Sequence, residues 1–444
     1  MDKPREAIFQ ILLKSFANHA YTNIALQVLS RPDFSRTDRA FATEIVYGTV
    51  SRKRSLEYII GKYASIPIRK MSAQVYVLLL MGTYQIYYMD RVPVSAACNT
   101  SVDLAKVHCS KSSGFVNAIL RSIVRGIDNL KWPDISEGNI TSLGIYYSYP
   151  DWMIKSWIGS YGLDMTKLLM KAGNSHPPLS IRVNQTINSR DELLEILEEE
   201  GVSVSKGSAS EDAIVLHSPE NFSRLTSFIE GRFTIQDESA MLVAAIADPK
   251  PGDMVLDTCS APGGKTTHLA ERMKNTGSIT AWDLHENKLS LIEESAARLK
   301  LSIITTKQQD ASVFVEDELE KYDCVLVDAP CSGTGIIRRK PDIKWNRNPS
   351  DISALVEIQS KILYNAGRYV KQGGVLVYST CSMEKEENEE VCERFLTEFH
   401  CECKETVVNK DSKSALYVLE GSYRHLYPTN DETDGFFIAR FRRQ

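Results

Sequence analysis

VLDTCSAPGGKTTHLA (residues 255–270) reads as an apolar strand, a glycine turn and a helix that begins near Lys265. Gly263 and Gly264 allow a tight bend and close approach of a ligand to the backbone, and the N-terminus of the following helix favours an anionic group. The G-x-G-x-x-G spacing of a dinucleotide-binding loop is absent, and the turn carries Pro262 instead. This segment therefore predicts a ligand-binding strand–turn–helix unit that does not match a dinucleotide site.

Strands and helices alternate along the chain from Ala240 onward. The expected strands are MVLDT, SITAWDL, IITTKQ, DCVLVDA and GVLVYST, and the expected helices are KTTHLAERMK, NKLSLIEESAARLK and SALVEIQSKILYNAGRYV. ETVVN and GFFIARFRR add one or two strands near the C-terminus. Such alternation is typical of a doubly wound parallel sheet. We therefore predict a Rossmann-like domain over residues 239–444.

Two further domains are expected ahead of it. Residues 1–132 have apolar side chains at helical spacing and no convincing strand, and Asp38 and Ser72 stand at positions that suit helix N-caps. Residues 145–238 alternate short strands such as SIRVN with helices such as SRDELLEILEEEGV. The predicted fold class is therefore multidomain α and α/β: an all-α domain, a small αβ subdomain and the Rossmann-like domain.

Charge is distributed unevenly along the chain. The net charge of −5 alone argues against a nucleic-acid-binding protein, yet residues 1–130 hold 17 Lys and Arg against 9 Asp and Glu, a balance of +8. The remaining residues then carry −13. A basic module joined to an acidic body suggests that the module meets a polyanion. The alternative is a helical domain whose solvated face happens to be basic.

Composition and the cysteines exclude several other classes. Of the 444 residues, 43% are hydrophobic and 25% are charged, and Gly82 and Gln85 interrupt the longest apolar run, VYVLLLMGTYQIYYM. That run predicts a buried helix, so we expect a soluble, cytoplasmic protein without a membrane partner. Nine cysteines without a C-x-x-C pair give no disulfide framework and no zinc pattern. HCEC near residue 400 is the one metal-like cluster, and thiols at a helix end explain it better, so no metal is expected.

Three acidic residues end successive strands of the predicted sheet. Asp283 ends the second strand, Asp310 follows the third and Asp328 ends the fourth. The first can accept both ribose hydroxyls of a nucleoside and the second an adenine amino group. A ribose and an adenine without a pyrophosphate loop indicate S-adenosylmethionine as cofactor. The alternative is that each acid only caps the helix after its strand.

Two cysteines also follow strands of this sheet. Cys331 lies in DAPCSGTG (residues 328–335) and Cys381 in YSTCSMEKEENEE (residues 378–390). The two strands should be neighbours, so both thiols should open toward one crevice. We expect a helix to begin at Ser382, and its N-terminal dipole would lower the pKa of the Cys381 thiol.

A thiolate beside a methyl sulfonium suits one reaction in particular. Carbon 5 of a pyrimidine is a poor nucleophile, but addition of a thiolate at carbon 6 makes carbon 5 able to accept a methyl group. The charge that develops on the base needs a donor at ring nitrogen 3, a role that we assign to Asp328 in its protonated form. The second thiol would then help release the product.

Several motifs carry a family resemblance. CSAPGGKT, DAPCSGTG, RRKPDIKW and STCS resemble the motifs of RNA cytosine-5 methyltransferases, and DRAFATEIVYGTVSRKRSLEYII and GFVNAILRSI are similar to the antitermination factor N-utilisation substance B (NusB). The fusion resembles a bacterial family that methylates small-subunit (16S) ribosomal RNA. The resemblance implies that Cys381 is the nucleophile and that Cys331 assists release. The cofactor residues that it implies are Cys259, Ser260, Ala261, Pro262, Gly263, Gly264 and Lys265, together with Asp283, Asp310 and Asp328. Ser260 stands where the family often has alanine, a small change.

A basic segment follows the Cys331 loop. Residues 336–347, IIRRKPDIKWNR, contain the candidate RNA-binding residues Arg338, Arg339, Lys340, Lys344 and Trp345. Cations can contact phosphates and an indole can stack on an exposed base, although a plain surface loop is the alternative. The target nucleotide must be unpaired or flipped out of its stack to reach Cys381. We expect a monomer acting on 16S ribosomal RNA, as naked RNA or as an early assembly intermediate.

Three other interpretations stay open from the sequence. The same chemistry could act on transfer RNA. The basic N-terminal residues also suit a non-catalytic RNA-binding or antitermination factor, although such a protein needs neither cysteine nor the acids. Finally, DNA cytosine methyltransferases attack with the cysteine that follows a proline, which here would be Cys331.

Overall fold

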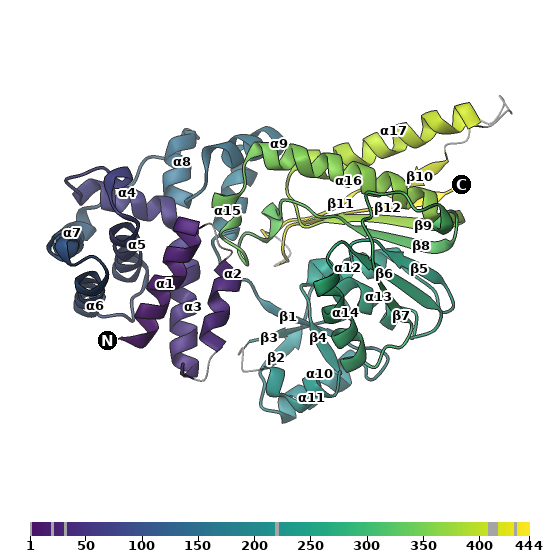
Figure 1. Cartoon of the computed structure of the whole chain (residues 1–444), viewed down its shortest axis with the longest axis horizontal. Coiled ribbons are helices and arrows are strands. Elements are labelled where there is room, and N and C mark those ends of the chain that lie inside the picture. Colours follow the sequence, from purple (N-terminus) through teal and green to yellow (C-terminus); the bar gives the residue numbers. More distant parts are fainter. Residues whose placement is uncertain (1, 19–21, 31–32, 218–221, 407–415, 430–432) are drawn as a thin grey trace. The chain divides into compact units, whose positions relative to one another are not determined.

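The computed structural model describes residues 2–18, 22–30, 33–217, 222–406, 416–429 and 433–444. The chain forms two compact units (Figure 1). Unit 1 contains Met1–Ser175 and Ile337–Asn348, and unit 2 contains His176–Ile336 and Pro349–Gln444. The division differs from the expected domain bounds, because residues beyond 132 and a segment after the Cys331 loop both belong to unit 1.

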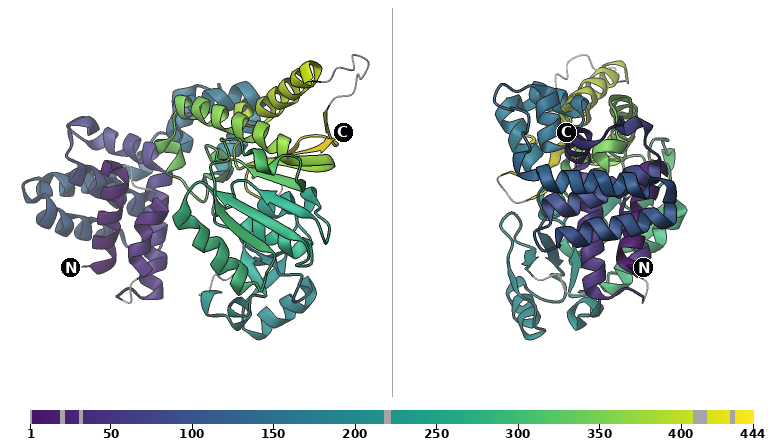
Figure 2. Two further views of the ribbon diagram at one scale, coloured as in Figure 1. Left: turned by 45° about the vertical axis from the view of Figure 1, so that its right-hand side comes forward. Right: turned by 90° about the vertical axis from the view of Figure 1, so that its left-hand side faces the viewer.

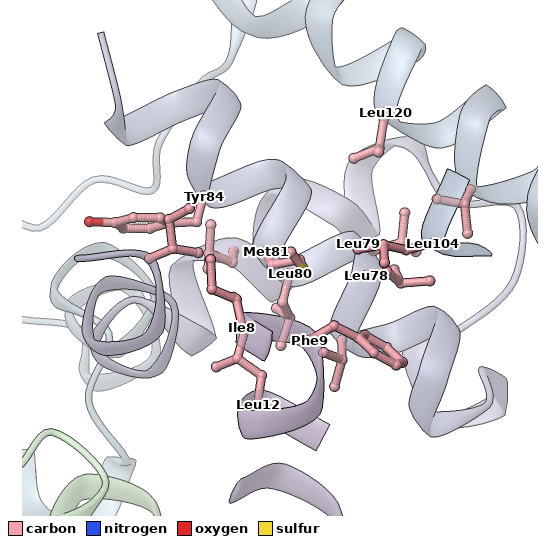
Figure 3. Close-up of a cluster of buried hydrophobic side chains, with 14 of the residues drawn as sticks. Ile8, Phe9, Leu12, Leu78, Leu79, Leu80, Met81, Tyr84, Leu104 and Leu120 are labelled. Atoms are coloured by element: carbon pink, nitrogen blue, oxygen red, sulfur yellow. The ribbon is translucent and has the colours of Figure 1, made fainter. Parts of the chain in front are cut away.

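Unit 1 is helical over its described residues, which confirms the all-α prediction. Its α-helices are α1 (Lys3–Asn18), α2 (Thr22–Ala25), α3 (Arg36–Ser51), α4 (Lys53–Tyr63), α5 (Ala73–Tyr88), α6 (Val94–His108), α7 (Ser113–Gly126), α8 (Ile140–Tyr147), α9 (Asp151–Ala172) and α15 (Ile343–Asn346). The apolar helix α5 packs against α1, α3, α4, α6 and α7. Figure 3 shows its Leu78 and Leu80 among side chains of the surrounding helices. Helix α5 is therefore the centre of the core, as its apolar run predicts.

One of the two predicted N-caps is correct. Ser72 caps α5 and accepts a hydrogen bond from the backbone N–H of Val75. The prediction of Asp38 as a cap was wrong: Ser35 caps α3, and Asp38 is the third residue of a capping box. The Asp38 carboxylate accepts from the backbone N–H of Ser35 at 3.0 Å. Aspartate is favoured both at the N-cap and in the first turn of a helix, so the sequence placed the cap three residues too late.

The first part of unit 2 is a four-stranded antiparallel sheet in the order β2-β3-β1-β4. Its elements are β1 (Leu179–Val183), α10 (Arg190–Glu199), β2 (Val204–Lys206), β3 (Ala213–Leu216), α11 (Thr226–Ile229) and β4 (Phe233–Ile235). Its core includes Ile181, Leu193, Ile214 and Phe233. This is the expected small αβ subdomain, with β2 as a short strand that its sequence did not reveal.

The rest of unit 2 is built on a larger sheet. Its strands are β5 (Met254–Asp257), β6 (Ser278–Asp283), β7 (Ile304–Gln308), β8 (Tyr322–Asp328), β9 (Val370–Thr380), β10 (Tyr417–Leu419), β11 (Arg424–Leu426) and β12 (Phe436–Arg443). The order is β10-β12-β9-β8-β5-β6-β7, with β11 beside β12. Strands β5 to β9 pair in parallel, and β12 is antiparallel to β9. This confirms the Rossmann-like prediction. The order reverses between β5 and β8, where such sheets bind ligands.

Helices cover both faces of this sheet (Figures 1 and 2). They are α12 (Glu238–Ala247), α13 (Gly264–Arg272), α14 (Glu286–Arg298), α16 (Pro349–Tyr369) and α17 (Glu389–Thr406). Val325 and Val327 of β8 pack with α16 and α17, whereas Cys324 and Leu326 pack with α12, α13 and α14. Successive side chains of a strand point to opposite faces, so a continuous apolar strand fills both layers. Glu405 and Thr406 of the predicted strand ETVVN end α17, and its other residues lie outside the described ones.

Candidate active site

The glycine loop connects β5 with α13. The backbone N–H of Ser260 and its hydroxyl both donate to the Trp282 carbonyl oxygen, at 2.8 and 2.7 Å. The N–H of Ala261 donates to Asp283 at 3.2 Å. Gly263 has a φ of 99°, and a Cβ there would lie 3.1 Å from the Cα of Ile292. The loop therefore lies against the end of β6, in a conformation that requires glycine.

The acids at the strand ends lie in the neighbouring loops. Asp283 accepts from the N–H of His285 at 2.9 Å, and Asp310 accepts from the N–H and hydroxyl of Ser312 at 2.9 and 2.7 Å. These are local turn bonds and not helix caps, because the N-cap of α14 is His285 and the next helical turn after Asp310 starts only at Glu316. A carboxylate has about four acceptor sites, so such bonds leave capacity for a ligand. The N–H of Gln309 donates to the carbonyl of Asp283 at 3.0 Å and brings the two loops together.

Sequence reasoning missed three residues at this edge of the sheet. Leu284 and Val313, directly after Asp283 and close after Asp310, are 54% and 56% exposed. The sequence does show an apolar residue close after each of these acids, and this signal could have indicated the surface. Asp257 ends β5, is fully buried and accepts from Thr266 at 2.7 Å. Burial, above all, raises the pKa of Asp257 to about 7.

The two predicted catalytic thiols lie together. Strands β8 and β9 are parallel neighbours, with Asp328 opposite Ser379, which confirms that the cysteines follow adjacent strands. The Sγ atoms of Cys331 and Cys381 are 3.4 Å apart, and both residues are half-buried. The hydrogen bond with Cys381 and then burial raise the pKa of Cys331 well above its ordinary value. The contact with Cys381 and burial therefore both disfavour ionisation of Cys331.

Lys265 lies beside these thiols as well as in the first turn of α13. Its Nζ is 2.7 Å from Asp328, which also accepts from the Ser379 hydroxyl at 2.9 Å. Burial acts to lower the pKa of Lys265, but the charge of Asp328 and, to a lesser degree, of Cys381 brings it above its ordinary value. Asp328 thus accepts from both Lys265 and Ser379, and the Lys265 ammonium also interacts electrostatically with Cys381.

The helix expected at Ser382 is not there. Ser382 is buried, and a short 3₁₀ turn at Lys385–Glu387 comes before α17, which begins at Glu389. The prediction that a helix dipole activates Cys381 was therefore wrong, since the dipole acts only within the first turn. Cys381 instead interacts electrostatically with Lys265 and with Cys331.

The structure corrects part of the predicted RNA-binding segment. Lys344 is 1% exposed, and its ammonium donates to the Ser51 carbonyl at 2.9 Å and to Asn174 Oδ1 at 2.8 Å. Trp345 packs against the core of unit 1 and donates its indole N–H to the Val50 carbonyl at 2.7 Å. These two residues serve the packing of unit 1. Lys340 is exposed, and Arg338 and Arg339 are half-buried.

A buried arginine joins the small sheet to the glycine loop. Arg182 of β1 is fully buried and forms an ion pair with Glu271 of α13 at 2.7 Å. It also donates to the carbonyl oxygen of Gly264 at 2.5 Å and to the Thr267 hydroxyl at 3.0 Å. Asn184 donates to the carbonyls of Gly231 and Leu299. Arg182 and Asn184 in the strand SIRVN therefore have a structural role, and their burial excludes contact with RNA.

The remaining cysteines and helices give no other site. Burial raises the pKa of Cys259 in the glycine loop and of Cys324 and Cys392 in the core. Among the described side chains, no group of three His, Cys, Asp or Glu could hold a metal ion, and the side chains of HCEC lie outside them. None of the helices in the described ranges is long and apolar enough to cross a membrane.

Comparison with known proteins assigns each part of the chain to a family. The family described as 16S rRNA methyltransferase RsmB/F matches residues 244–442 and the NusB family matches residues 2–125. The ferredoxin-like domain of the RsmF/B-like methyltransferases matches residues 149–223. These matches cover the larger sheet, most of unit 1 and most of the small sheet.

Relatives of known sequence and structure match nearly the full length. The probable ribosomal RNA small subunit methyltransferase B of Bacillus subtilis is 40% identical over 99% of this chain and 98% of that protein. The ribosomal RNA small subunit methyltransferase B of Proteus mirabilis is 33% identical over 97% and 99%. The solved structure of PH0851 has a TM-score of 0.78 at 26% identity and covers 99% of this chain and 98% of that one. These relatives and the domain matches show that the chain belongs to the 16S rRNA methyltransferase RsmB/F family and carries a NusB-family domain.

Proposed function

We propose that this chain transfers a methyl group from S-adenosylmethionine to carbon 5 of a cytosine in 16S ribosomal RNA, through a transient bond between Cys381 and the base. The observation that carries the proposal is the 3.4 Å between the Cys331 and Cys381 sulfurs, beside the Lys265–Asp328 pair. The family of the chain and the names of its relatives support small-subunit ribosomal RNA as substrate. The chain would act as a monomer on naked RNA or on an early assembly intermediate.

The residues at the strand ends fit the cofactor. S-adenosylmethionine would supply a methyl group on a positively charged sulfonium. The glycine loop, with the N-terminus of α13, suits its carboxylate. Asp283 would accept from the ribose hydroxyls and Asp310 from the adenine amino group. The exposed side chains of Leu284 and Val313 offer apolar surface to the adenine ring.

Cys381 attacks carbon 6 of the cytosine in this mechanism. Ionisation is disfavoured at Cys331, so we assign the role of the attacking thiolate to Cys381. The electron pair of the 5,6 double bond becomes available at carbon 5, which takes the methyl group. Negative charge that develops at ring nitrogen 3 would be stabilised by the Lys265 ammonium, which Asp328 holds in place.

Cys331 completes the cycle. Once Cys381 is bonded to the base, its hydrogen bond with Cys331, the largest cause of the raised pKa of Cys331, is weakened. Cys331 can then lose its proton to solvent and accept the proton from carbon 5. The 5,6 double bond forms again, and Cys381 leaves as a thiolate. The cycle restores both sulfurs and releases one proton, as the net methylation requires.

Substitution of Cys381 tests the proposal. We expect Cys381→Ala to lower methyl transfer from labelled S-adenosylmethionine to 16S ribosomal RNA by at least about 10³-fold, because the covalent step is lost. Binding of S-adenosylhomocysteine, measured by calorimetry, should stay within about twofold, and Cys109→Ala, a half-buried thiol in unit 1, should keep full activity. Bisulfite mapping should place the methyl group on carbon 5 of one cytosine. Methylation of transfer RNA alone, or substantial activity of Cys381→Ala, would contradict the proposal.

A further inference from the structure

Glu387 is a buried acid that the mechanism above does not use. Its side chain is fully buried. The hydrogen bonds that it accepts come from neutral donors: the N–H and hydroxyl of Ser332, the Ser382 hydroxyl at 2.5 Å and the amide of Gln359 at 2.9 Å. The bond from the Ser332 N–H measures 2.8 Å. Four donors offset much of the cost of burying a carboxylate.

These donors come from the two loops that carry the thiols. Ser332 directly follows Cys331, and Ser382 directly follows Cys381. Both hydroxyls donate to the same oxygen of Glu387, and they lie 3.1 Å from one another. One carboxylate therefore connects the residues next to both sulfurs.

Gln359 of α16 secures the same arrangement from a third side. Its amide group donates to Glu387 and also to the carbonyl oxygen of Pro330, at 2.9 Å each. Pro330 directly precedes Cys331. The Cys331 loop is thus held on both sides of the thiol by groups that meet at Glu387.

The two loops also touch directly, with little room to shift. The N–H of Gly335 donates to the Cys381 carbonyl at 2.9 Å, and the N–H of Met383 donates to Thr334 at 2.9 Å. A Cβ on Gly335 would lie 2.1 Å from the carbonyl oxygen of Gly435. A small change at Glu387 would therefore be transmitted to the sulfurs rather than absorbed.

The charges that face Cys331 are those of Cys381, Glu387 and Asp328. A charge on Cys331 would also interact with the hydroxyl of Tyr378. The cation Lys265 interacts with Cys381 and Asp328. A fixed negative charge at Glu387 disfavours a second negative charge on Cys331. The thiol that can ionise beside a cation is then Cys381.

We propose that Glu387 is a positioning residue that sets the spacing of the two sulfurs and keeps Cys331 protonated, so that Cys381 is the thiol that attacks. The inference rests on the proposed function, whose two thiol roles it explains. A residue that only stabilised the fold would leave the relative acidity of the thiols unchanged.

Alkylation of the full-length chain by iodoacetamide across a range of pH tests this inference without RNA. Mass spectrometry of the two cysteine peptides gives a midpoint pH for each thiol. In the native chain Cys381 should react at lower pH than Cys331. Glu387→Gln keeps the shape of the side chain and removes its charge, so the midpoint of Cys331 should fall by about one pH unit or more. Glu386→Gln, an exposed neighbour, should leave both midpoints in place.

The possible results separate the two proposals. An unmoved Cys331 midpoint in a folded Glu387→Gln chain overturns the inference. If that variant does not fold, Glu387→Asp withdraws the charge by one methylene and should give a smaller fall, and an unmoved midpoint again overturns the inference. If the midpoints move as expected but the native chain makes no 5-methylcytosine, the proposed function fails and the control of thiol acidity by Glu387 stands.

Discussion

Lys265 shows how one side chain can connect two parts of a site. It lies in the first turn of α13, in the glycine loop that would hold the cofactor, and its ammonium contacts Asp328 next to the thiols. It also lies 5.1 Å from the centre of the Phe436 ring. A lysine in such surroundings remains charged only because a carboxylate is close. The charged state of Lys265 therefore depends on Asp328, a residue outside the glycine loop.

Cys331→Ala should trap the intermediate of the proposed reaction. Without the second thiol, the proton on carbon 5 has no base, so the bond between Cys381 and the RNA should persist. A covalent protein–RNA complex should accumulate with S-adenosylmethionine and appear as a slow band on a denaturing gel.

The double variant Cys331→Ala/Cys381→Ala is the matched control and should give no such band. A band that forms when Cys381 alone is replaced would exchange the two roles and support attack by Cys331.

Lys344 illustrates why the role of a single residue can be wrongly predicted from the sequence. A lysine next to an indole in a basic segment suggests contact with RNA, yet this ammonium is buried 4.2 Å from the centre of the Tyr149 ring. Burial lowers its pKa well below the ordinary value. Lysines are almost never fully buried without partners. Its acceptors, Ser51 and Asn174, are far away in sequence, so no local pattern could have identified them.

At the scale of elements, the small sheet supports the cofactor loop. Arg182 of β1 binds Glu271 in the last turn of α13 and the Gly264 carbonyl in its first turn. One side chain thereby spans the helix that follows the loop. The sequence predicted SIRVN as a short strand. It did not reveal the partner of Arg182, because helix α13 lies about 80 residues further along the chain.

Arg182→Met should affect both stability and cofactor binding. Removal of one partner leaves Glu271 buried and unpaired, which should lower the free energy of unfolding of unit 2 by about 3–5 kcal/mol. Loss of the bond to Gly264 should weaken S-adenosylhomocysteine binding by about 1 kcal/mol, or roughly fivefold. Thermal unfolding and calorimetry measure the two effects.

Arg298→Met provides the control for this effect. Arg298 of α14 donates to the carbonyls of Phe228 in α11 and Phe233 in β4, so its hydrogen bonds go to the small αβ subdomain and not to the glycine loop. It should lower stability and leave cofactor affinity unchanged. An equal loss of cofactor affinity in Arg182→Met and Arg298→Met would mean that general destabilisation of the contact with the small sheet, and not loss of the bond to Gly264, weakens binding.

The segment after β9 shows why its helix begins late. SMEKEENEEVCERFLTEF has a composition that suits a helix from Ser382. Instead, Ser382 and Glu387 form hydrogen bonds with the Cys331 loop, and the Asn388 amide donates to the Ser382 carbonyl at 3.0 Å. Tertiary hydrogen bonds have replaced helical ones over these residues, so propensity alone placed the helix start too early.

At the scale of the whole molecule, unit 1 extends beyond the predicted N-terminal domain of residues 1–132. Helices α8 and α9 and the segment Ile337–Asn348 belong to it. Deletion of residues 1–130 would remove the core against which Trp132 and Trp345 pack. A test of the basic module should therefore change its charge and keep the chain intact.

Arg69→Gln/Lys70→Gln should weaken RNA binding in a salt-dependent way. Both residues are exposed in unit 1. If both contact phosphates, the slope of log affinity against log salt concentration should fall by about 1.4, or roughly 0.7 for each contact. Filter binding over a series of salt concentrations measures the slope.

Lys274→Gln/Lys361→Gln, an exposed pair in unit 2, is the matched control and should leave the slope unchanged. Equal slopes for the native chain and both double variants would refute the role of these two residues of the basic module.

The sequence by itself determined the alternation of strands and helices, the glycine loop and the positions of Asp283, Asp328, Cys331 and Cys381 at strand ends. Periodicity and turn residues act over a few neighbouring positions, so they can be read locally. Tertiary structure alone decided that the two sulfurs lie 3.4 Å apart, that Glu387 joins both thiol loops and that Lys344 is buried. Burial and electrostatic coupling arise between residues that are distant in the chain, and only packing brings those residues together.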